Sequence, residues 1–195
     1  GGLVPTGCSA CESYDLAADG MSLTFKLKDG LTWHDGDDFT VEDVAWSIRT
    51  AIKAPRTHSV VGNTVNSITG AAAFKDGSTD DVSGIKYNIA DGSITLEMAT
   101  LDPNILTTFS QFAILPKHAL EGVDVMQLQN SDFWQMPIGS GPFKIEEVKM
   151  NDFAKLVPFD NYHGGTANFD IIAYPSFDGD GNLIKNAAAG KMDYG

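Results

Sequence analysis

The segment between Thr40 and Pro55 constrains the fold more than any other part of this sequence. Its apolar residues recur at helical spacing, so a helix over 41–53 would bury one face, formed by Val41, Val44, Ala45, Ile48 and Ile52. Thr40 with Asp43 three residues later is close to a capping box, and Pro55 stops the helix. Trp46 lies on the opposite face, and its large apolar surface predicts a second structural unit that covers it.

Several stretches around this helix alternate apolar and polar residues with the period of a strand. Residues 22–28 alternate before a turn at Asp29-Gly30, and alternating runs over 85–89 and 94–98 flank Asp91-Gly92 as a hairpin. Further strands are expected over 143–148, 153–158 and 169–174, and short helices over 68–74, 102–108, 117–120 and 182–189. This mixture, without an internal repeat, predicts an α+β architecture.

The 195 residues suffice for one buried core, and a formal net charge of −13 limits the partners. Such a charge repels the phosphates of nucleic acids and anionic lipid surfaces, so neither is expected to bind. No apolar run reaches the roughly 20 residues that span a bilayer, and no N-terminal segment resembles a signal peptide. Because the sequence begins with Gly1 rather than Met, we interpret it as a piece of a longer chain.

The cysteines Cys8 and Cys11 have the C-x-x-C spacing of a redox pair. A redox pair normally lies at a helix N-terminus, whereas Pro5, Gly7 and strand-like residues surround these cysteines. A short-loop disulfide and two plain thiols both fit the sequence better. A zinc site would need two further ligands, which the sequence does not offer at usable spacing.

Other patterns that suggest chemistry each miss a requirement. The run 178–182 begins like a calcium loop, but Leu183 and Ala189 stand where that loop needs Gly and Glu. Gly139-Ser140-Gly141 suggests a phosphate loop, yet a strand rather than a helix follows it. No Gly-x-Ser-x-Gly elbow is present, and the histidines lie far apart in the sequence, at His34, His58, His118 and His163. We therefore expect no catalytic residue, no metal and no cofactor.

A series of short motifs runs along almost the whole chain in a defined order. The first are Cys11-Glu12-Ser13-Tyr14 through Asp19-Gly20, Leu23 to Gly30, Trp33-His34-Asp35-Gly36 and Thr40-Val41-Glu42-Asp43-Val44. The later ones are Ile114 to His118, Ile138 to Phe143, Asn161 to Gly165 and Ala189 to Asp193. In this order they resemble the bacterial extracellular solute-binding proteins of family 5, the peptide/nickel class. Cys8 and Cys11 depart from the family, which has apolar or small residues at these positions.

The resemblance implies a periplasmic-binding-protein-like lobe of mixed β-sheet with flanking helices and a small packed subdomain. Residues 1–195 would form most of lobe I of a two-lobe protein, with an inserted subdomain at about 56–130. The complete protein would capture oligopeptides or dipeptides between its lobes and deliver them to ABC permease subunits at the membrane. It would be a monomer, extracellular or periplasmic, and anchored as a lipoprotein.

The family also binds nickel complexes, haem and some sugars. A nickel-chelate or oligosaccharide receptor is therefore the alternative within the family. Outside it, the alternatives are a secreted hydrolase and an inert interaction module.

The same resemblance indicates which residues face the ligand. Phe109 and Phe112 lie in the segment that approaches the solute, and Trp134 and Ser140 flank the glycine-rich turn near the same mouth. Aromatic rings supply apolar area at low entropic cost, which suits the side chains of peptides. The alternative is that the three aromatic residues belong to an ordinary core.

Overall fold

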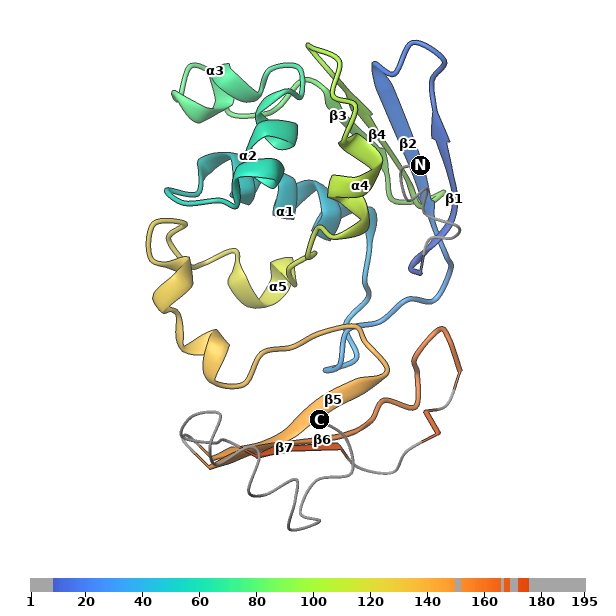
Figure 1. The fold of residues 1–195 in the computed structure, drawn as a ribbon, viewed down its shortest axis with the longest axis vertical. Helices are drawn as coiled ribbons and strands as arrows, with labels where there is room; N and C mark the ends of the chain where they lie inside the picture. The colour runs from blue at the N-terminus through green and yellow to red at the C-terminus, as the bar shows by residue number, and fades with distance from the viewer. Residues whose placement is uncertain (1–8, 150–151, 166, 169–171, 176–195) are drawn as a thin grey trace, which may run out of the picture.

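The structure is a computed structural model that describes residues 9–149, 152–165, 167–168 and 172–175. Within these ranges it contains two β-sheets and a group of short helices (Figure 1). The larger sheet consists of β1 (Cys11–Leu16), β2 (Ser22–Leu27), β3 (Ile85–Asn88) and β4 (Ser93–Glu97). The smaller sheet consists of β5 (Phe143–Lys149), β6 (Phe153–Pro158) and β7 (Ile172–Pro175). The helices are α1 (Val41–Lys53), α2 (Ser59–Asn66), α3 (Ala71–Lys75), α4 (Ile105–Ser110) and α5 (Lys117–Leu120), with 3₁₀ turns η1 (Leu128–Asn130) and η2 (Asp132–Gln135). The predicted α+β class is confirmed.

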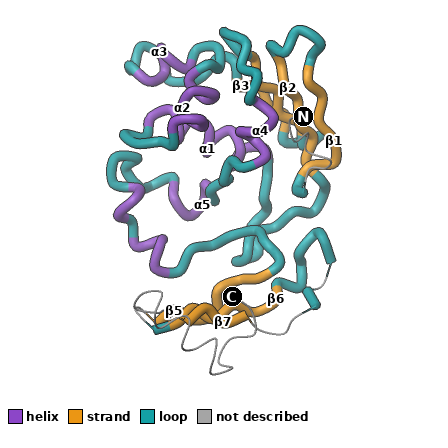
Figure 2. The backbone as a smooth tube through the Cα atoms, in the orientation of Figure 1, coloured by secondary structure: helices purple, strands orange, loops and turns teal. Residues whose placement is uncertain are grey.

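The larger sheet has the strand order β1-β2-β4-β3, and all its pairings are antiparallel. In the central pair, Leu23 lies opposite Leu96 and Phe25 lies opposite Ile94. Because side chains alternate across a strand, these four point to one face of the sheet. The helices α1 to α4 lie on one side of this sheet (Figure 2). Leu23 and Leu96 have no exposed surface, so the core lies between the sheet and the helices. The strand expected over 22–28 is confirmed as β2, and the hairpin expected over 85–89 and 94–98 is confirmed as β3 and β4.

Helix α1 has the predicted bounds and the predicted cap. The Thr40 hydroxyl oxygen accepts the Glu42 N–H at 3.2 Å, and Asp43 Oδ2 accepts the Thr40 N–H at 2.9 Å. These two bonds form the capping box that satisfies donors at the start of the helix. The predicted apolar face is buried, at 0% exposure for Ile48 and Ile52, while Trp46 on the opposite face is partly buried.

The helix expected over 117–120 is confirmed as α5, whereas two other short helices begin later than expected for reasons of local backbone geometry. Gly70 adopts φ +83°, a left-handed conformation that interrupts a helix, so the helix expected over 68–74 begins only at Ala71. Asp102 Oδ1 accepts the N–H of Asn104 at 2.8 Å, and this local turn delays the start of α4 to Ile105.

Helix α2 has no counterpart among the helices expected from the sequence. Three of its eight residues are valine, yet its buried residues are Thr64 and Val65. Thr64 Oγ1 lies 2.9 Å from the Thr108 hydroxyl in α4. Packing between helices, rather than local periodicity, therefore stabilises this helix.

The range 56–130, expected as an inserted subdomain, contains α2 to α5, β3 and β4. Because β4 pairs with β2, this range shares the larger sheet with the N-terminal strands. A separate subdomain over 56–130 stays a prediction.

After η2 the chain enters the smaller sheet, whose order is β5-β6-β7 with antiparallel pairing. This confirms the strands expected over 143–148 and 153–158, and β7 confirms part of the strand expected over 169–174. The predicted helix over 182–189, the run 178–182 and Cys8 lie outside the described residues. Cys11 is 3% exposed and is not a free thiol.

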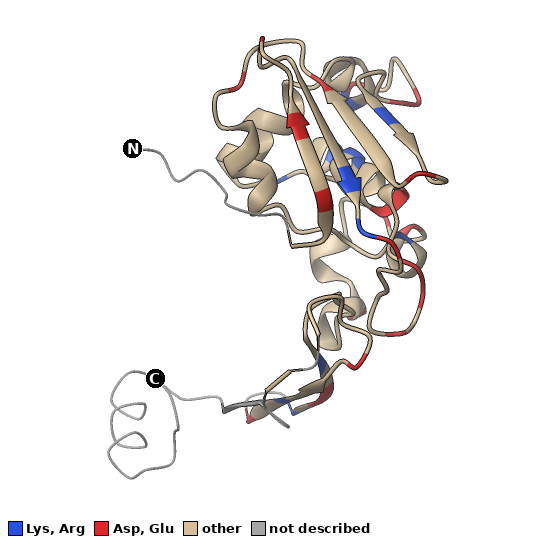
Figure 3. Ribbon diagram, turned by 90° about the vertical axis from the view of Figure 1, so that its right-hand side faces the viewer, with Lys and Arg blue, Asp and Glu red and all other residues tan. Residues whose placement is uncertain are grey.

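Charged residues of both signs lie on the strands of the larger sheet, and acidic residues are frequent in the turns at its ends (Figure 3). Lys26 on β2 pairs with Glu12 on β1 at 2.7 Å, and both side chains are exposed. Exposed pairs of this kind contribute little to stability, so the fold depends on the opposite, apolar face. Within the described ranges, no helix combines the length and the apolar character required to cross a bilayer.

Candidate functional site

An apolar hollow of about 360 Å³ opens between the larger sheet and α4. Aromatic residues from several elements dominate its lining, namely Tyr14, Phe25, Phe39, Phe109 and Phe112. Leu106, Ile94 and Ile114 supply further apolar surface, and none of the described residues lining the hollow is charged. A hollow of this character suits an uncharged apolar group.

Helix α4 positions the aromatic wall of this hollow. Ile105 and Thr108 form its buried face, which leaves Phe109 directed toward the hollow. The rings of Phe109 and Phe25 are 5.8 Å apart and edge-on, as are those of Phe109 and Phe112 at 5.7 Å. Phe109 and Phe112 are partly buried and also pack against the core. Phe109 and Phe112, both predicted site residues, therefore line the hollow and also pack against the core.

Phe112 also lines a second hollow of about 330 Å³, on the side of α1. Its lining includes the polar residues Arg56, His58, Gln111 and Gln129 beside apolar ones. Phe112 thus lies between an uncharged hollow and one whose lining also carries hydrogen-bonding side chains. This combination of a ring with adjacent polar groups is what a peptide side chain and its main chain require.

The other two predicted site residues do not join this wall. Trp134 is 45% exposed on η2, donates its indole N–H to Leu128 O at 2.7 Å and lies edge-on to Phe133. Ser140 lines a separate space of only about 10 Å³ beside Thr32 and Asn161. The structure therefore brings Phe109 and Phe112 together and places Trp134 and Ser140 elsewhere.

The glycine-rich turn has a role that the sequence did not reveal, as the partner of His34. The His34 N–H donates to Gly139 O at 2.9 Å, and the Gly139 N–H donates to Nδ1 of His34 at 3.2 Å. Nδ1 is therefore unprotonated, and Nε2–H is the donor to Gly141 O at 3.0 Å. A Cβ on Gly139 would lie 3.1 Å from Cε1 of His34, which makes glycine the fitting residue.

The imidazole of His34 also lies edge-on to Phe159, with ring centroids 5.0 Å apart. Burial lowers the pKa of His34 below its ordinary value of 6.5. The neutral imidazole thus connects the turn that follows the larger sheet's first hairpin to the chain that enters the smaller sheet. No spacing rule relates residues this far apart, so sequence reasoning could not identify the pair.

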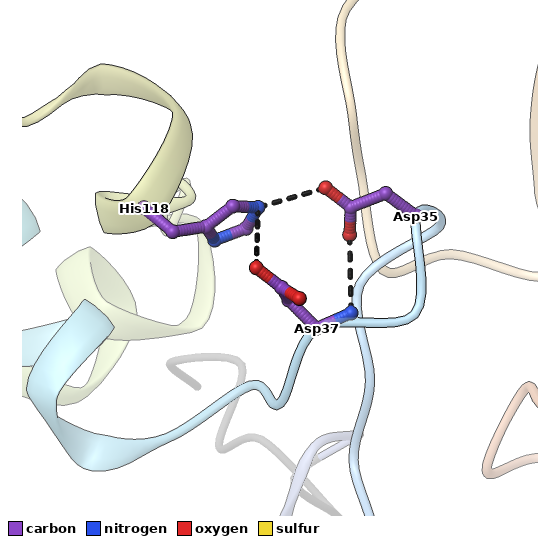
Figure 4. Close-up of side chains that lie close together, drawn as sticks. All are labelled: Asp35, Asp37 and His118. Carbon is purple, nitrogen blue, oxygen red and sulfur yellow. Dashed lines mark hydrogen bonds and ion pairs between the residues drawn. The ribbon is translucent and has the colours of Figure 1, made fainter.

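A second histidine is brought into contact with acidic residues. His118 Nε2 lies 2.8 Å from Asp35 Oδ2 and 3.5 Å from Asp37 Oδ2 (Figure 4). The sequence separates these residues widely, and the expectation of scattered histidines missed the contact. Within the described residues, this is the group whose donor atoms have a spacing suited to a metal ion.

Comparisons with known proteins agree with the resemblance seen in the sequence motifs. Residues 9–195 match the family of bacterial extracellular solute-binding proteins, family 5 Middle. The oligopeptide-binding protein AppA of Bacillus subtilis is 27% identical over 188 residues, covering 95% of this chain and 32% of the relative. The dipeptide-binding protein of Lactococcus lactis is 27% identical over 167 residues, covering 85% of this chain and 28% of the relative.

The solved structure of Bacillus subtilis AppA in complex with a nonapeptide superposes on this chain with a TM-score of 0.79 at 25% identity. The match covers 94% of this chain and 34% of that one. The chain thus spans about a third of the length of the relatives it matches. The family consists of solute-binding proteins, not enzymes. With its fold and nearly its whole length matched, this chain belongs to the bacterial extracellular solute-binding proteins of family 5.

Proposed function

We propose that this chain is part of lobe I of a two-lobe protein that captures oligopeptides or dipeptides and delivers them to an ABC permease. The observation that carries the proposal is the aromatic wall: Phe109 and Phe112 line an uncharged apolar hollow, and Phe112 also lines a second hollow that includes polar residues. Similarity to relatives named for peptide binding supports it. In the complete protein, Trp134 and Ser140 would contact the ligand at positions outside this wall.

The cellular context of the proposal follows from the family. An extracellular solute-binding protein meets its ligand outside the cytoplasm and must be held near its permease. We propose a monomer with a lipoprotein anchor, because a tether raises the effective concentration of the loaded protein at the membrane.

The test is Phe112→Ala in the complete protein, with a nonapeptide as ligand. We expect at least a tenfold loss of affinity by isothermal titration calorimetry, because the ring forms a wall of both hollows. The loss of unfolding free energy should stay below the roughly 3–5 kcal/mol of a fully buried Phe, since Phe112 is only partly buried.

Phe74→Ala is the matched control, because Phe74 is 6% exposed and lines neither hollow. It should lower stability and leave the peptide affinity unchanged. Unchanged affinity in Phe112→Ala would contradict the proposed wall. Binding of a nickel–histidine complex or a maltooligosaccharide in place of the peptide would favour the alternative receptors.

A further inference from the structure

A tight turn between the larger sheet and α1 presents two carboxylates on one side. The Trp33 N–H donates to Asp37 O at 2.8 Å, and the Gly36 N–H donates to Trp33 O at 3.0 Å. Gly36 adopts φ +98°, which allows the chain to reverse here. The Asp37 N–H donates to Asp35 Oδ1 at 3.3 Å, so Asp35 keeps its other oxygen for His118. The turn thus orients the Asp35 carboxylate through its own backbone.

The third group comes from α5, which is itself held firmly. The Lys117 N–H donates to Asp43 Oδ1 at 3.0 Å, which joins the start of α5 to the capping box of α1. The ring of His118 lies 6.4 Å from that of Trp33, a residue with 1% exposure. These contacts hold His118 in place beside the turn, which preorganises its ring as a metal ligand.

The charges of this group are not balanced by the protein. Within the described residues, neither Asp35 nor Asp37 forms an ion pair with a lysine or an arginine; both pair with His118 alone. A neutral imidazole leaves two negative charges, and a protonated one still leaves one. The single Nε2 also cannot donate a strong hydrogen bond to both carboxylates, so its contact with Asp37 at 3.5 Å is weak. A divalent cation would neutralise both charges and bind all three groups.

We propose that Asp35, Asp37 and His118 form a binding site for a divalent transition metal of the zinc or nickel type. The three donor atoms lie within 4.8 Å of one another. Zinc bonds of about 2.0–2.2 Å place neighbouring donors roughly 3.4 Å apart, a spacing that small side-chain movements provide here. The imidazole donor favours such metals over calcium and magnesium, which prefer oxygen. All three residues are exposed, which leaves further coordination positions open to water.

Bound metal would join the turn before α1 to α5, and the site lies apart from both hollows. The proposal is therefore independent of the peptide-binding function. Binding needs no redox step, because the ion exchanges bound water for the protein ligands, and the ligands release any protons that they carry.

The test is titration of the chelator-treated complete protein with ZnCl₂ and, separately, NiCl₂, read by calorimetry and thermal unfolding. We expect one saturable site that is weakened at least tenfold by His118→Gln and by Asp37→Asn. The melting temperature should rise with metal concentration in the unmodified protein and much less in these two variants. CaCl₂ should not compete.

His58→Gln and Asp38→Asn are matched controls, because both residues are exposed and lie outside the group. They should retain the metal affinity of the unmodified protein. Circular dichroism of the metal-free variants verifies that each is folded. Absence of saturable binding, or equal affinity in Asp37→Asn and Asp38→Asn, would overturn the proposal.

Discussion

Asp43 shows how one side chain connects local and distant structure. One carboxylate oxygen closes the capping box of α1, and the other accepts the backbone N–H of Lys117. The residue is 5% exposed, and its backbone oxygen accepts the Ser47 hydroxyl at 2.7 Å. Ser47 in turn accepts the Leu115 N–H at 2.8 Å. These bonds satisfy buried donors that would otherwise cost about 1–3 kcal/mol each.

Replacing Thr40 by Ala should cost about 1 kcal/mol of unfolding free energy, because the Glu42 N–H loses its acceptor. Urea denaturation measures the change. Thr107→Ala on the exposed side of α4 is the control and should cost nothing, since Ala is the better helix former. An unchanged midpoint for Thr40→Ala would count against the capping role.

Stability should depend on pH through His34. The unfolded chain binds a proton at the ordinary pKa of 6.5, whereas the folded chain holds the imidazole neutral with a lowered pKa. The contribution of His34 is therefore complete above pH 6.5 and is lost as the pH falls below it, because the unfolded state then binds more protons. Protonation also removes the acceptor of the Gly139 N–H.

The measurement is the unfolding free energy from pH 7.5 down to about 5, in buffer with a chelator. We expect His34→Gln to reduce the loss of stability over this window, as the titrating group is gone. His58→Gln, at an exposed histidine, should keep the slope of the unmodified protein. Parallel curves for all three proteins would refute the assignment.

At the level of elements, the entry to β3 depends on close contact between backbones. Gly84 donates its N–H to Thr69 O at 2.8 Å, and its oxygen accepts the Glu97 N–H at 2.8 Å. A Cβ at this position would lie 2.6 Å from Glu97 O and 2.9 Å from the Thr69 nitrogen. Both obstacles are backbone atoms in hydrogen bonds, so they cannot move aside without cost.

Gly84→Ala should therefore destabilise the protein by roughly 1–3 kcal/mol, the usual cost of overpacking. Gly122→Ala is the matched control, because a Cβ there meets no atom within 4 Å. Denaturation curves of the two variants should separate clearly. Coincident curves would show that the β3 entry can relax around the added methyl group.

For the whole molecule, the relevant fact is that the chain spans about a third of its relatives' length. A small ligand usually needs roughly 70–90% of its surface buried for firm binding. We expect the 195-residue chain alone to bind a nonapeptide at least a hundredfold more weakly than the complete protein. Calorimetry on both proteins gives the comparison, and submicromolar binding by the short chain would falsify the proposed enclosure between lobes.

Local pattern determined much of this protein. The helix over 41–53, with its cap at Thr40, and the strands of the larger sheet's hairpin are confirmed because periodicity and capping act within a few residues. The ordered motifs also identified the family, which the comparison over residues 9–195 confirms. Phe109 and Phe112, which the family resemblance indicates as ligand-facing, lie in one wall.

Tertiary structure alone decided the rest. Helix α2 depends on packing against α4. Ser140 lies away from the aromatic wall because the chain there runs toward the smaller sheet. The contact of His34 with Gly139 joins residues 105 positions apart, and that of His118 with Asp35 joins residues 83 positions apart. Sequence patterns report periodicity over single elements, whereas these contacts arise only when separate elements pack together and orient individual side chains.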